Sequence, residues 1–402
     1  MTWPSTELGS LCSVITKGTT PRTLGQEYVS DGIPFLRAEN LQGDEVCLGP
    51  ETLYIDAETQ RMLSRSMIYP GDVLISIAGT IGRCAIVPKD MPVMNCNQAV
   101  AIVRIAGPLE RRFLLHWLKT ADAQRQMSGG KVTLTIANLS LGQIKKLRIP
   151  LPPLSEQRRI VEILDQADAL RKKRAEADAK AARILPALFY RMFGDPATNP
   201  KRWELKLFEH AFVDYTARCP KLQKNEYQPF GRFPVIDQGK QLIAGYCDDE
   251  TLVVNTERAV IVFGDHTRVV KYVDFPFVAG ADGSRVFLAR DGFEPAFLAA
   301  QLDLMPIPDL GYSRHMREVR RFRFIAPPVE LQMDYARRAA TCRPVLSAQI
   351  KSANHIESIW NVLLHRAFTG DLTAKWREAH MKELLQEMEQ QAKVLNQSRS
   401  EA

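Results

Sequence analysis

The sequence lacks the features that define several large protein classes. No apolar run approaches the roughly 18–20 residues of a membrane-spanning helix, and no basic segment followed by an apolar stretch opens the chain. We therefore expect a cytoplasmic protein with no membrane partner. The seven cysteines are an odd number and include no Cys-x-x-Cys pair, which argues against a disulfide framework or a zinc ribbon. We expect all seven to be reduced core residues.

Catalytic motifs are also missing. The segment Ser128-Gly129-Gly130-Lys131-Val132 lacks the leading glycine and the hydroxyl residue of a nucleotide-triphosphate loop. There is no G-x-G-x-x-G after a strand and no H-E-x-x-H, and 199–201 (NPK) lacks the second proline and the aromatic residue of an amino-methyltransferase site. A faint nuclease pattern at 308–320 has arginine in place of the expected lysine. The sequence predicts a non-catalytic protein that binds no metal or cofactor.

The composition is that of a folded protein with an acidic partner. Among 402 residues, 45% are hydrophobic and 25% are charged, and Lys and Arg exceed Asp and Glu to give a formal charge of +7. The length suits two or three domains of about 100–200 residues each. Net positive charge favours nucleic acid as the partner, although many basic proteins bind none.

An internal repeat runs through the whole chain. IPLPPLSEQ (149–157) recurs as FIAPPVELQ (324–332), so that Pro152, Pro153 and Gln157 match Pro327, Pro328 and Gln332 at an offset of 175 residues. FGDPATNPKRWE (193–204) and FTGDLTAKWRE (368–378) follow at nearly the same offset, and Trp3 opens the first copy as Trp203 opens the second.

A long amphipathic helix follows each Pro-Pro pair. Apolar residues recur at heptad spacing from Ile160 to Leu188 and from Ala339 to Ala367, with small alanines at many of these positions. The pattern predicts a paired antiparallel coil, with a kink or a frayed turn at Pro186 and Pro344. Two unrelated surface helices are the alternative. The mixed charges of the first helix favour a solvated or partner-facing surface.

The segments before the helices favour an α+β fold. VLISIA (73–78) and VIVF (260–263) are apolar, β-branched runs bounded by Gly and Asp, and IPFLRAENL (33–41) and FPVIDQGKQ (233–241) occupy like places. Short helices are predicted at 110–120 and 295–304. The expected architecture is two globular α/β domains separated by two long antiparallel helices with a pseudo-twofold repeat.

Three groups of polar loop residues are candidates for DNA contact. The strongest is the basic segment 311–323, in which arginine can pair with guanine or clamp a phosphate. The second is 264–268 with its first-half counterpart 79–83, and the third comprises the small-residue loops 17–22 and 128–131. A solvated basic edge, turn chemistry and plain surface positions are the alternatives. The candidate DNA-binding residues are Lys17, Thr20, Arg22, Arg37, Asn40, Arg83, Gln98, Ser128, Lys131, Gln238, Lys240, His266, Arg268, Ser313, Arg314, His315 and Arg317.

The repeated motifs resemble those of the specificity subunit of type I restriction–modification enzymes. The resemblance rests on 149–165 (IPLPPLSEQRRIVEILD), 185–204 (LPALFYRMFGDPATNPKRWE) and 363–378 (LLHRAFTGDLTAKWRE). It implies target-recognition domains at 1–154 and 196–328, conserved spacer helices at 155–195 and 329–372, and a C-terminal helical tail at 373–402 that completes the repeat. About 35 helical residues span roughly 50 Å, which would set the two domains about one DNA turn apart.

The resemblance also implies partners and cofactors. Each recognition domain would read one half of a bipartite, asymmetric site on double-stranded DNA. Two modification (methyltransferase) subunits would use S-adenosylmethionine to methylate adenine N6, and restriction/translocase subunits that use ATP and Mg would join through this methyltransferase core. The alternatives are a self-sufficient restriction enzyme, which the missing motifs disfavour, and a protein scaffold that recruits methyltransferase partners without reading DNA.

Overall fold

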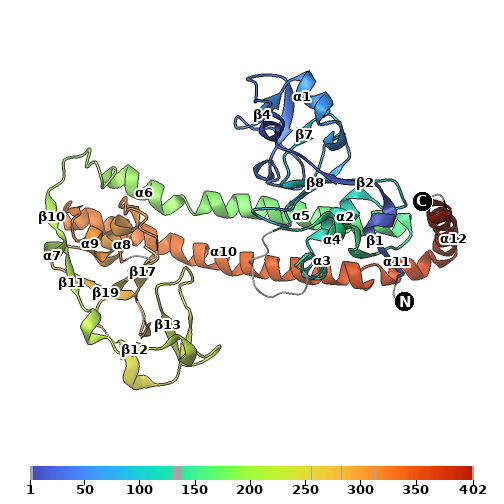
Figure 1. Cartoon of the computed structure of the whole chain (residues 1–402). Coiled ribbons are helices and arrows are strands. Elements are labelled where there is room, and N and C mark those ends of the chain that lie inside the picture. Colours follow the sequence, from blue (N-terminus) through green and yellow to red (C-terminus); the bar gives the residue numbers. More distant parts are fainter. Residues whose placement is uncertain (1–2, 129–137, 255, 282, 312–313, 401–402) are drawn as a thin grey trace. The chain divides into compact units, whose positions relative to one another are not determined.

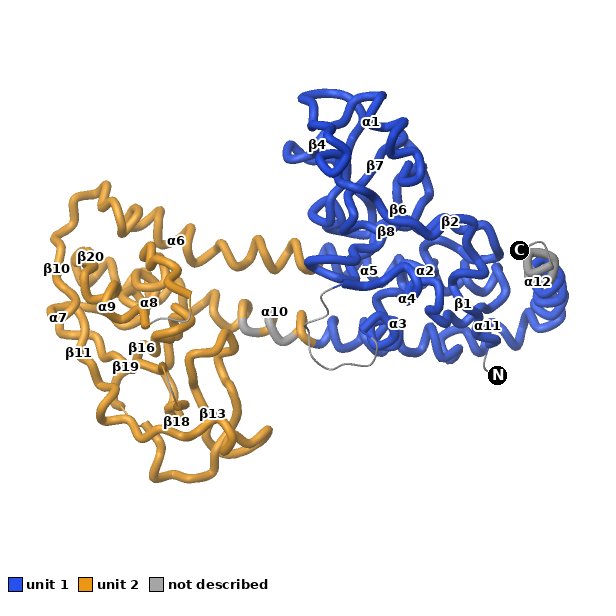
Figure 2. Tube along the Cα trace, viewed as in Figure 1, with its two compact units in different colours: residues 1–173, 355–402 blue, residues 174–354 orange. Residues whose placement is uncertain are grey.

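The computed structural model describes residues 3–128, 138–254, 256–281, 283–311 and 314–400. The chain divides into two compact units, residues 1–173 with 355–402 and residues 174–354 (Figure 2). Figure 1 labels the long helices α5 (Leu154–Ala181) and α10 (Val329–Thr369), and each contributes to both units (Figure 2). Among the described residues, no helix is long and apolar enough to cross a membrane.

Unit 1 is built on two small sheets. The first has the antiparallel order β2-β8-β5-β6, and the second places β3 between antiparallel β4 and parallel β7. Every residue of β5 is buried, as expected for a continuous apolar run in a central strand. The strands of unit 1 are β1 (Ser5–Glu7), β2 (Cys12–Lys17), β3 (Ile33–Leu36), β4 (Leu53–Ile55), β5 (Val73–Ser76), β6 (Cys84–Ile86), β7 (Asn95–Cys96), β8 (Val100–Ile105) and β9 (Arg148–Pro150).

Helices of unit 1 cover the first sheet and join the long helices to it. Helix α2 buries six consecutive residues, Phe113 to Leu118, and the Glu110 side chain accepts hydrogen bonds from the first-turn N–H groups of Arg112 and Phe113. Besides the long helices, the α-helices of unit 1 are α1 (Ala57–Met62), α2 (Arg111–Leu118), α3 (Ala121–Met127), α4 (Leu141–Lys145), α11 (Ala374–Ala379) and α12 (Met381–Ser400). One apolar core therefore includes the sheet, α2 and residues of both long helices.

Unit 2 repeats this topology. Its first sheet has the antiparallel order β11-β19-β16-β17, and in its second sheet β13 pairs with antiparallel β14 and parallel β18. The strands are β10 (Leu205–Leu207), β11 (Phe212–Asp214), β12 (Lys221–Leu222), β13 (Phe233–Ile236), β14 (Gly245–Cys247), β15 (Val253–Val254), β16 (Val260–Gly264), β17 (Val270–Val273), β18 (Phe277–Gly280), β19 (Ser284–Ala289) and β20 (Arg323–Ile325). The helices are α6 (Ile184–Phe193), α7 (Phe208–Ala211), α8 (Pro295–Leu304) and α9 (Met316–Val319).

The repeated glutamine explains why the Pro-Pro motif recurs. Gln157 is fully buried, donates to the carbonyls of Pro108 and Pro152 at 2.9 and 2.8 Å, and accepts from the Glu110 N–H at 2.8 Å. Gln332 makes the same three bonds, to Gly292 and Pro327 at 3.1 and 2.7 Å and from the Glu294 N–H at 2.9 Å. In each unit this amide ties the start of the long helix to the N-terminus of the short helix, which confirms the predicted repeat.

The long helices run antiparallel within each unit. In unit 1 the Arg171 guanidinium lies 4.9 Å from the Trp360 ring, and in unit 2 Arg174 bonds to the Gln349 carbonyl at 3.0 Å while the Phe189 and Tyr335 ring centroids are 5.6 Å apart. The α+β class and the antiparallel pairing are confirmed. The predicted break before Pro186 is found between α5 and α6, whereas α10 continues through Pro344.

Two details of the sequence-based prediction are wrong. Leu170 is one of the heptad positions predicted to lie between the paired helices, but it is 69% exposed. Ile160, Leu164 and Asp168 face inward instead. Spacing of four residues, rather than the heptad, sets this buried face, because α5 packs on α2 as well as on α10. The seven cysteines are free as expected, but Cys47 is exposed and Cys12 and Cys342 are partly exposed, so only Cys84, Cys96, Cys219 and Cys247 are core residues.

Candidate nucleic-acid interface

In unit 1, three loops meet beside the ends of strands β2, β3 and β7. Gly18 lies so close to this junction that a Cβ atom there would be 1.8 Å from the Cys96 carbonyl oxygen, so no other residue fits. The Thr19 N–H donates to the same carbonyl at 3.2 Å, and the Thr20 hydroxyl bonds to the Gln98 side chain. The Asn97 N–H donates to the Leu36 carbonyl at 3.0 Å, which brings in the segment after β3. We call residues 17–22, 36–40 and 96–98 the first loop cluster.

The structure brings six of the predicted residues into the first loop cluster. Lys17, Arg22 and Gln98 are exposed, and Arg22 pairs with Glu27 at 3.2 Å. Arg37 and Asn40 are half-buried: the Asn40 side chain accepts the Arg37 N–H at 2.9 Å, and the Arg37 guanidinium pairs with Glu39 at 3.2 Å. Thr20 and Asn40 therefore shape the loops, Gln98 is exposed but bonded to Thr20 through its amide oxygen, and Lys17 and Arg22 are exposed cations.

Two further residues of unit 1 lie elsewhere. Arg83 is exposed on the β5–β6 turn and lines a groove of about 780 Å³ together with residues of the 41–44 loop, α5 and α10. Ser128 ends α3, and its hydroxyl donates to the Arg125 carbonyl at 3.0 Å. Lys131 lies outside the described residues.

In unit 2 the loop after β13, which corresponds to the loop after β3, meets the loop after β16. The Gln238 side chain accepts from the His266 N–H at 3.3 Å, and its carbonyl accepts from the Thr267 hydroxyl. A Cβ atom on Gly283 would lie 2.5 Å from the Gln238 amide oxygen and 2.7 Å from the His266 ring, so these loops are closely packed. Arg268 has a positive φ of 64° and pairs with Asp309 at 2.7 Å. We call residues 237–240, 264–268, 283 and the described part of 309–317 the second loop cluster.

The basic loop of unit 2 presents arginines around a buried histidine. Arg314 and Arg317 are exposed, as is Lys240 in the neighbouring loop. His315 is fully buried: Nδ1 lies 2.8 Å from the Asp265 carbonyl, and Nε2 accepts from the Leu310 N–H at 3.2 Å. The His315 ring therefore shapes the loop and is not available at the surface. Ser313 lies outside the described residues.

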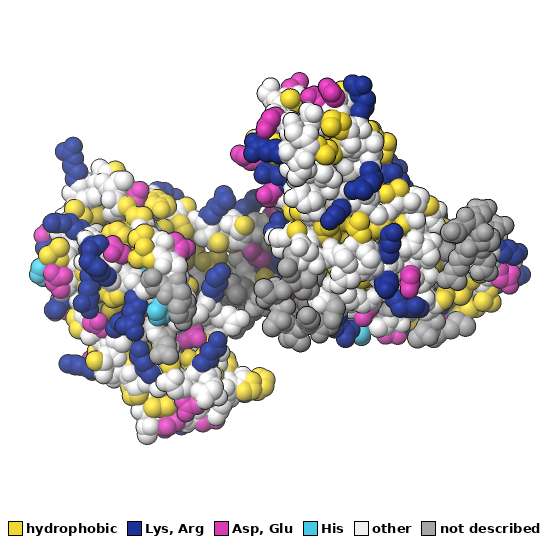
Figure 3. Space-filling model, viewed as in Figure 1, with side chains coloured by type: hydrophobic (Ala, Val, Ile, Leu, Met, Phe, Trp, Pro, Cys, Tyr) yellow, Lys and Arg dark blue, Asp and Glu magenta, His cyan; other side chains and the backbone are white. Residues whose placement is uncertain are grey.

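The surroundings of Asp309 in the second loop cluster and of Lys271 beside it shift the pKa values of both side chains downward. The Gly311 N–H and the Arg268 guanidinium hold the pKa of the Asp309 carboxyl below its usual range. Burial lowers the pKa of Lys271, whose ammonium donates to the Asp237 carbonyl at 2.7 Å. Figure 3 shows Lys and Arg side chains over the visible faces of both units, interspersed with Asp and Glu. Within the described residues, no group of three His, Cys, Asp or Glu side chains is placed to hold a metal ion.

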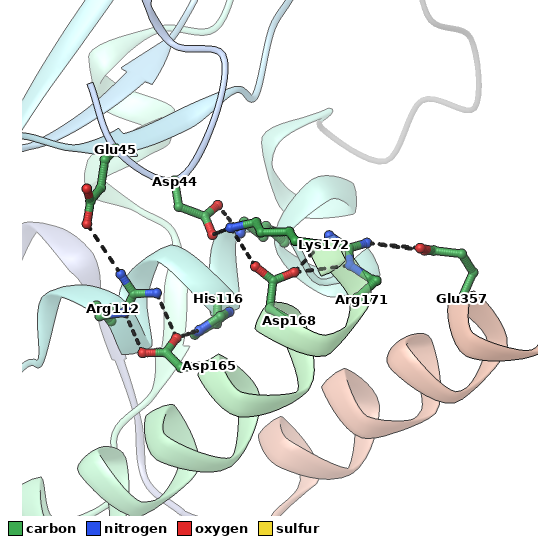
Figure 4. A network of polar contacts seen from close by, with 10 residues as sticks. Asp44, Glu45, Arg112, His116, Asp165, Asp168, Arg171, Lys172 and Glu357 are labelled. Carbon is green, nitrogen blue, oxygen red and sulfur yellow. Dashed lines mark hydrogen bonds and ion pairs between the residues drawn. The ribbon is translucent and has the colours of Figure 1, made fainter. Parts of the chain in front are cut away.

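A polar network in unit 1 was not predicted from the sequence (Figure 4). Asp44, in the loop after β3, pairs with Lys119 and with Lys172 of α5, the latter at 3.0 Å, and Lys172 also pairs with Asp168 at 2.8 Å. Arg171 joins Asp168 to Glu357 of α10. Burial alone would raise the pKa of Asp44, but the two lysines outweigh burial and hold this pKa well below its usual range.

A second part of this network joins α2 to α5. Asp165 accepts from the Arg112 guanidinium at 2.6 Å and lies 2.8 Å from Nε2 of the fully buried His116 (Figure 4). The interpretation of the charged face of α5 as solvated or partner-facing is therefore wrong for Asp165, which is bonded to α2, and for Asp168, which is 3% exposed. Asp165 and Lys172 bind α5 to the globular part of unit 1, whereas Arg171 pairs with Glu357 of α10. Helix periodicity alone gives no signal for these contacts, because Asp165, Arg171 and Lys172 have partners that are 49 to 186 residues away in the chain.

Asp265 lies in the predicted segment 264–268 but was not among the candidate DNA-binding residues. It is 1% exposed, its carboxylate accepts from the Met316 N–H at 2.8 Å, and it pairs with Arg285 at 3.3 Å. The sequence did indicate a structural role for Asp265, because this acidic residue directly follows the apolar run VIVFG (260–264).

The two units define a class of protein: a duplicated binding protein whose halves share one topology and present polar loops at the same place. The model of the "Type I restriction modification DNA specificity domain" family matches residues 1–178. This match covers less than half of the chain, and it assigns residues 1–178 a similarity to the specificity domain of type I restriction–modification systems.

Curated relatives agree with this assignment. The chain is 28% identical over 183 residues to the type I restriction enzyme EcoBI specificity subunit of Escherichia coli, which covers 44% of this chain and 38% of that relative. A putative specificity subunit of Haemophilus influenzae is 34% identical over 29% of this chain and 30% of its own length, so these two matches span about a third of each relative. The StySPI specificity subunit of Salmonella potsdam is 20% identical over 93% of this chain and 90% of its own length.

Solved structures show the same fold. The S subunit of a type I restriction-modification system from M. genitalium has a TM-score of 0.53 with 16% identity, covering 91% of this chain and 96% of its own. A chain from the work described as "Structural basis underlying complex assembly and conformational transition of the type I R-M system" has a TM-score of 0.51 with 17% identity, covering 92% and 98%.

Proposed function

We propose that this chain is the DNA-binding specificity subunit of a type I restriction–modification complex. In this proposal the first loop cluster reads one half of a bipartite, asymmetric site and the second reads the other half. The observation that carries it is the pair of loop clusters, because each includes the loop after one of the equivalent strands β3 and β13 and residues of the equivalent β7–β8 and β18–β19 loops. Two related but different loop sets suit two different half-sites.

The exposed side chains of the two clusters have the chemistry that DNA recognition needs. Lys17, Arg22, Lys240, Arg314 and Arg317 are exposed cations that can neutralise phosphates or pair with guanine. The Gln98 amide oxygen is bonded to Thr20, and its exposed NH2 group can donate to an acceptor on a base edge. Thr20, Asn40, Gln238 and His315 hold the loops through intramolecular hydrogen bonds.

Catalysis in this proposal belongs to partner chains. Two modification subunits carrying S-adenosylmethionine would methylate adenine N6 in each half-site, and restriction subunits using ATP and Mg would join through them. The target adenine must leave the base stack to reach the active site of a methyltransferase. In this proposal the chain places the methyltransferase at the target adenine, and the methyltransferase carries out the reaction. Its named relatives are specificity subunits, which supports this division.

The test is co-purification of the chain with the methyltransferase encoded beside it, followed by mapping of methylated adenines in the host genome. The proposal expects a bipartite motif with one modified adenine in each half, lost when the gene for this chain is deleted. A complex that forms but leaves no methyl mark would favour a protein scaffold that does not read DNA. Methylation by the isolated chain with S-adenosylmethionine would favour a self-sufficient enzyme.

A further inference from the structure

Asp265 connects three segments of the second loop cluster. Its N–H donates to the Gly283 carbonyl at 2.7 Å, and its carbonyl accepts from the N–H of His315 at 2.8 Å and lies 2.8 Å from His315 Nδ1. Its carboxylate accepts from the Met316 N–H at 2.8 Å and pairs with Arg285 at 3.3 Å. A residue with 1% exposure thus fixes both sides of the backbone from which Arg314 and Arg317 extend.

The first unit has an apolar residue at the equivalent position. The Ile77 N–H donates to the Ala99 carbonyl at 2.8 Å, and the Ile77 carbonyl accepts from the Leu139 N–H at 2.9 Å, which are the main-chain bonds that Asp265 makes to Gly283 and His315. Ile77 is 4% exposed and packs in the apolar core. The main chain therefore needs only a residue that continues the strand, and the carboxylate of Asp265 has an additional role.

That role concerns the short helix after the basic loop. In unit 1, Ser140 begins α4 and caps it locally, since its hydroxyl accepts the Gln143 N–H at 3.2 Å. In unit 2, α9 has no local side-chain cap, and the Met316 N–H is bonded instead by Asp265, which is 51 residues away in the chain. The position of the loop end before α9 is therefore set by the strand end after β16.

We propose that Asp265 is a positioning residue for base discrimination by the second loop cluster. The inference rests on the proposed function, because it assumes that the exposed arginines of this cluster face DNA. A buried carboxylate with two partners, a backbone N–H and a guanidinium, restricts the loop end to one position. Arg314 then meets the base edge from a fixed backbone, and loss of that restraint lets it adapt to wrong bases. A side chain held in one position contacts the correct base but cannot shift to contact a wrong one, so pre-organisation increases the difference in affinity between the two bases.

The experiment uses the complete methyltransferase complex with D265N, D265A and, as a matched control, D291N. D291N removes the same charge from the same unit, at a side chain that is 97% exposed and paired only with an exposed arginine at 3.2 Å. Methylation rates are measured on duplexes carrying the cognate site and on duplexes with one wrong base pair in either half. Unfolding temperature and the salt dependence of binding are measured on the same samples. The half read by unit 2 is the half that R314A affects.

We expect D265A to lower discrimination about tenfold in that half alone, and D265N to lower it less because its amide oxygen still accepts the Met316 N–H. The slope of affinity against salt should stay as in the wild type, since no phosphate contact is removed. Unchanged discrimination in D265A, or an equal loss in both halves together with a lower unfolding temperature, would overturn the inference and leave Asp265 a stabilising residue only. A wild-type complex that discriminates in neither half would overturn the proposed function and this inference with it.

Discussion

The first turns of the two long helices differ although the repeat aligns them residue by residue. In unit 1, Glu156 is fully buried: it accepts from the Trp3 indole, the Thr373 hydroxyl and the Arg377 guanidinium, and Glu387 of α12 accepts from the Ser155 hydroxyl. In unit 2, the matching residue is Leu331, which is 40% exposed beside Val329 at 39%. The C-terminal segment covers the first turn of α5, and the described part of this chain leaves the first turn of α10 open.

In the two units, different segments of the chain supply the tryptophan that packs at the end of a helix. In unit 2 the chain passes without a break from α6 to β10, and the Trp203 indole donates to the Phe193 carbonyl at 2.9 Å. In unit 1 the equivalent tryptophan, Trp3, comes from the other end of the chain and meets Gly370 and Arg377, whose guanidinium lies 4.9 Å from the Trp3 ring. Contacts between distant segments thus replace a covalent connection, and the buried Glu156–Arg377 pair secures them.

The largest effect is expected from R377A. It leaves the Glu156 carboxylate buried without its cation, at a side chain with 0% exposure, and should destabilise unit 1 by about 3–5 kcal/mol. Hydrogen exchange should rise around β1, α5 and α11 while unit 2 keeps its protection. The control is R337A, which removes an exposed arginine from unit 2. Equal protection in R377A and wild type would show that the termini do not close unit 1.

A matched pair of variants tests the feature that the units share. Q157A and Q332A each remove three hydrogen bonds and leave buried backbone groups without partners, so each should cost about 2–4 kcal/mol in its own unit. Protection of α2 should fall in Q157A, and protection of α8 should fall in Q332A. A marked loss in one unit with none in the other would contradict the equivalence of the two glutamines.

Asp44 distinguishes the units by pH. Because its folded-state pKa is depressed, Asp44 contributes stability that is present above the unfolded value near 3.8 and is lost as pH falls through its folded value. D44N should therefore destabilise unit 1 at pH 7 by about 1.5–3 kcal/mol, as expected for hydrogen bonds to charged groups. The difference from wild type in urea unfolding should shrink progressively below pH 4.

The control for this variant is D31N, which removes an exposed carboxylate from the same unit. A difference between D44N and wild type that stays constant from pH 7 to pH 3 would mean that the ionised carboxylate of Asp44 has no part in holding the loop. In unit 2 the residue of α8 that matches Lys119 at the end of α2 is Asp303, so a carboxylate takes the place of the ammonium group. The stability of unit 2 should therefore depend on pH differently from that of unit 1 between pH 7 and pH 3.

The smallest effects concern single contacts at the loop clusters. R314A should lower discrimination in one half-site by about 1–3 kcal/mol, and R22A should act on the other half. Relative binding to duplexes with one substituted base pair in either half measures both. Loss of discrimination in both halves by either single variant would argue against two independent reading units.

The sequence predicted the repeat, the helices and the strand runs because these follow from local chemistry. Proline ends a helix, a buried strand reads as a continuous apolar run, and Gln157 and Gln332 recur because both units need the same buried amide. The heptad seam was less accurate at Leu170, since α5 packs on two elements and not on one partner helix. The candidate loops were located, but the inward-facing role of His315 was not apparent from its basic neighbours.

The sequence by itself determined the order of elements and the duplicated topology, because both are encoded in patterns along the chain. Only the tertiary structure decided which polar side chains face solvent and which hold loops together. Asp44 meets Lys172, Glu156 meets Arg377 and Asp265 meets the Met316 N–H across separations of 51 to 221 residues. Burial and pairing at such distances depend on how elements pack, and no local pattern records them.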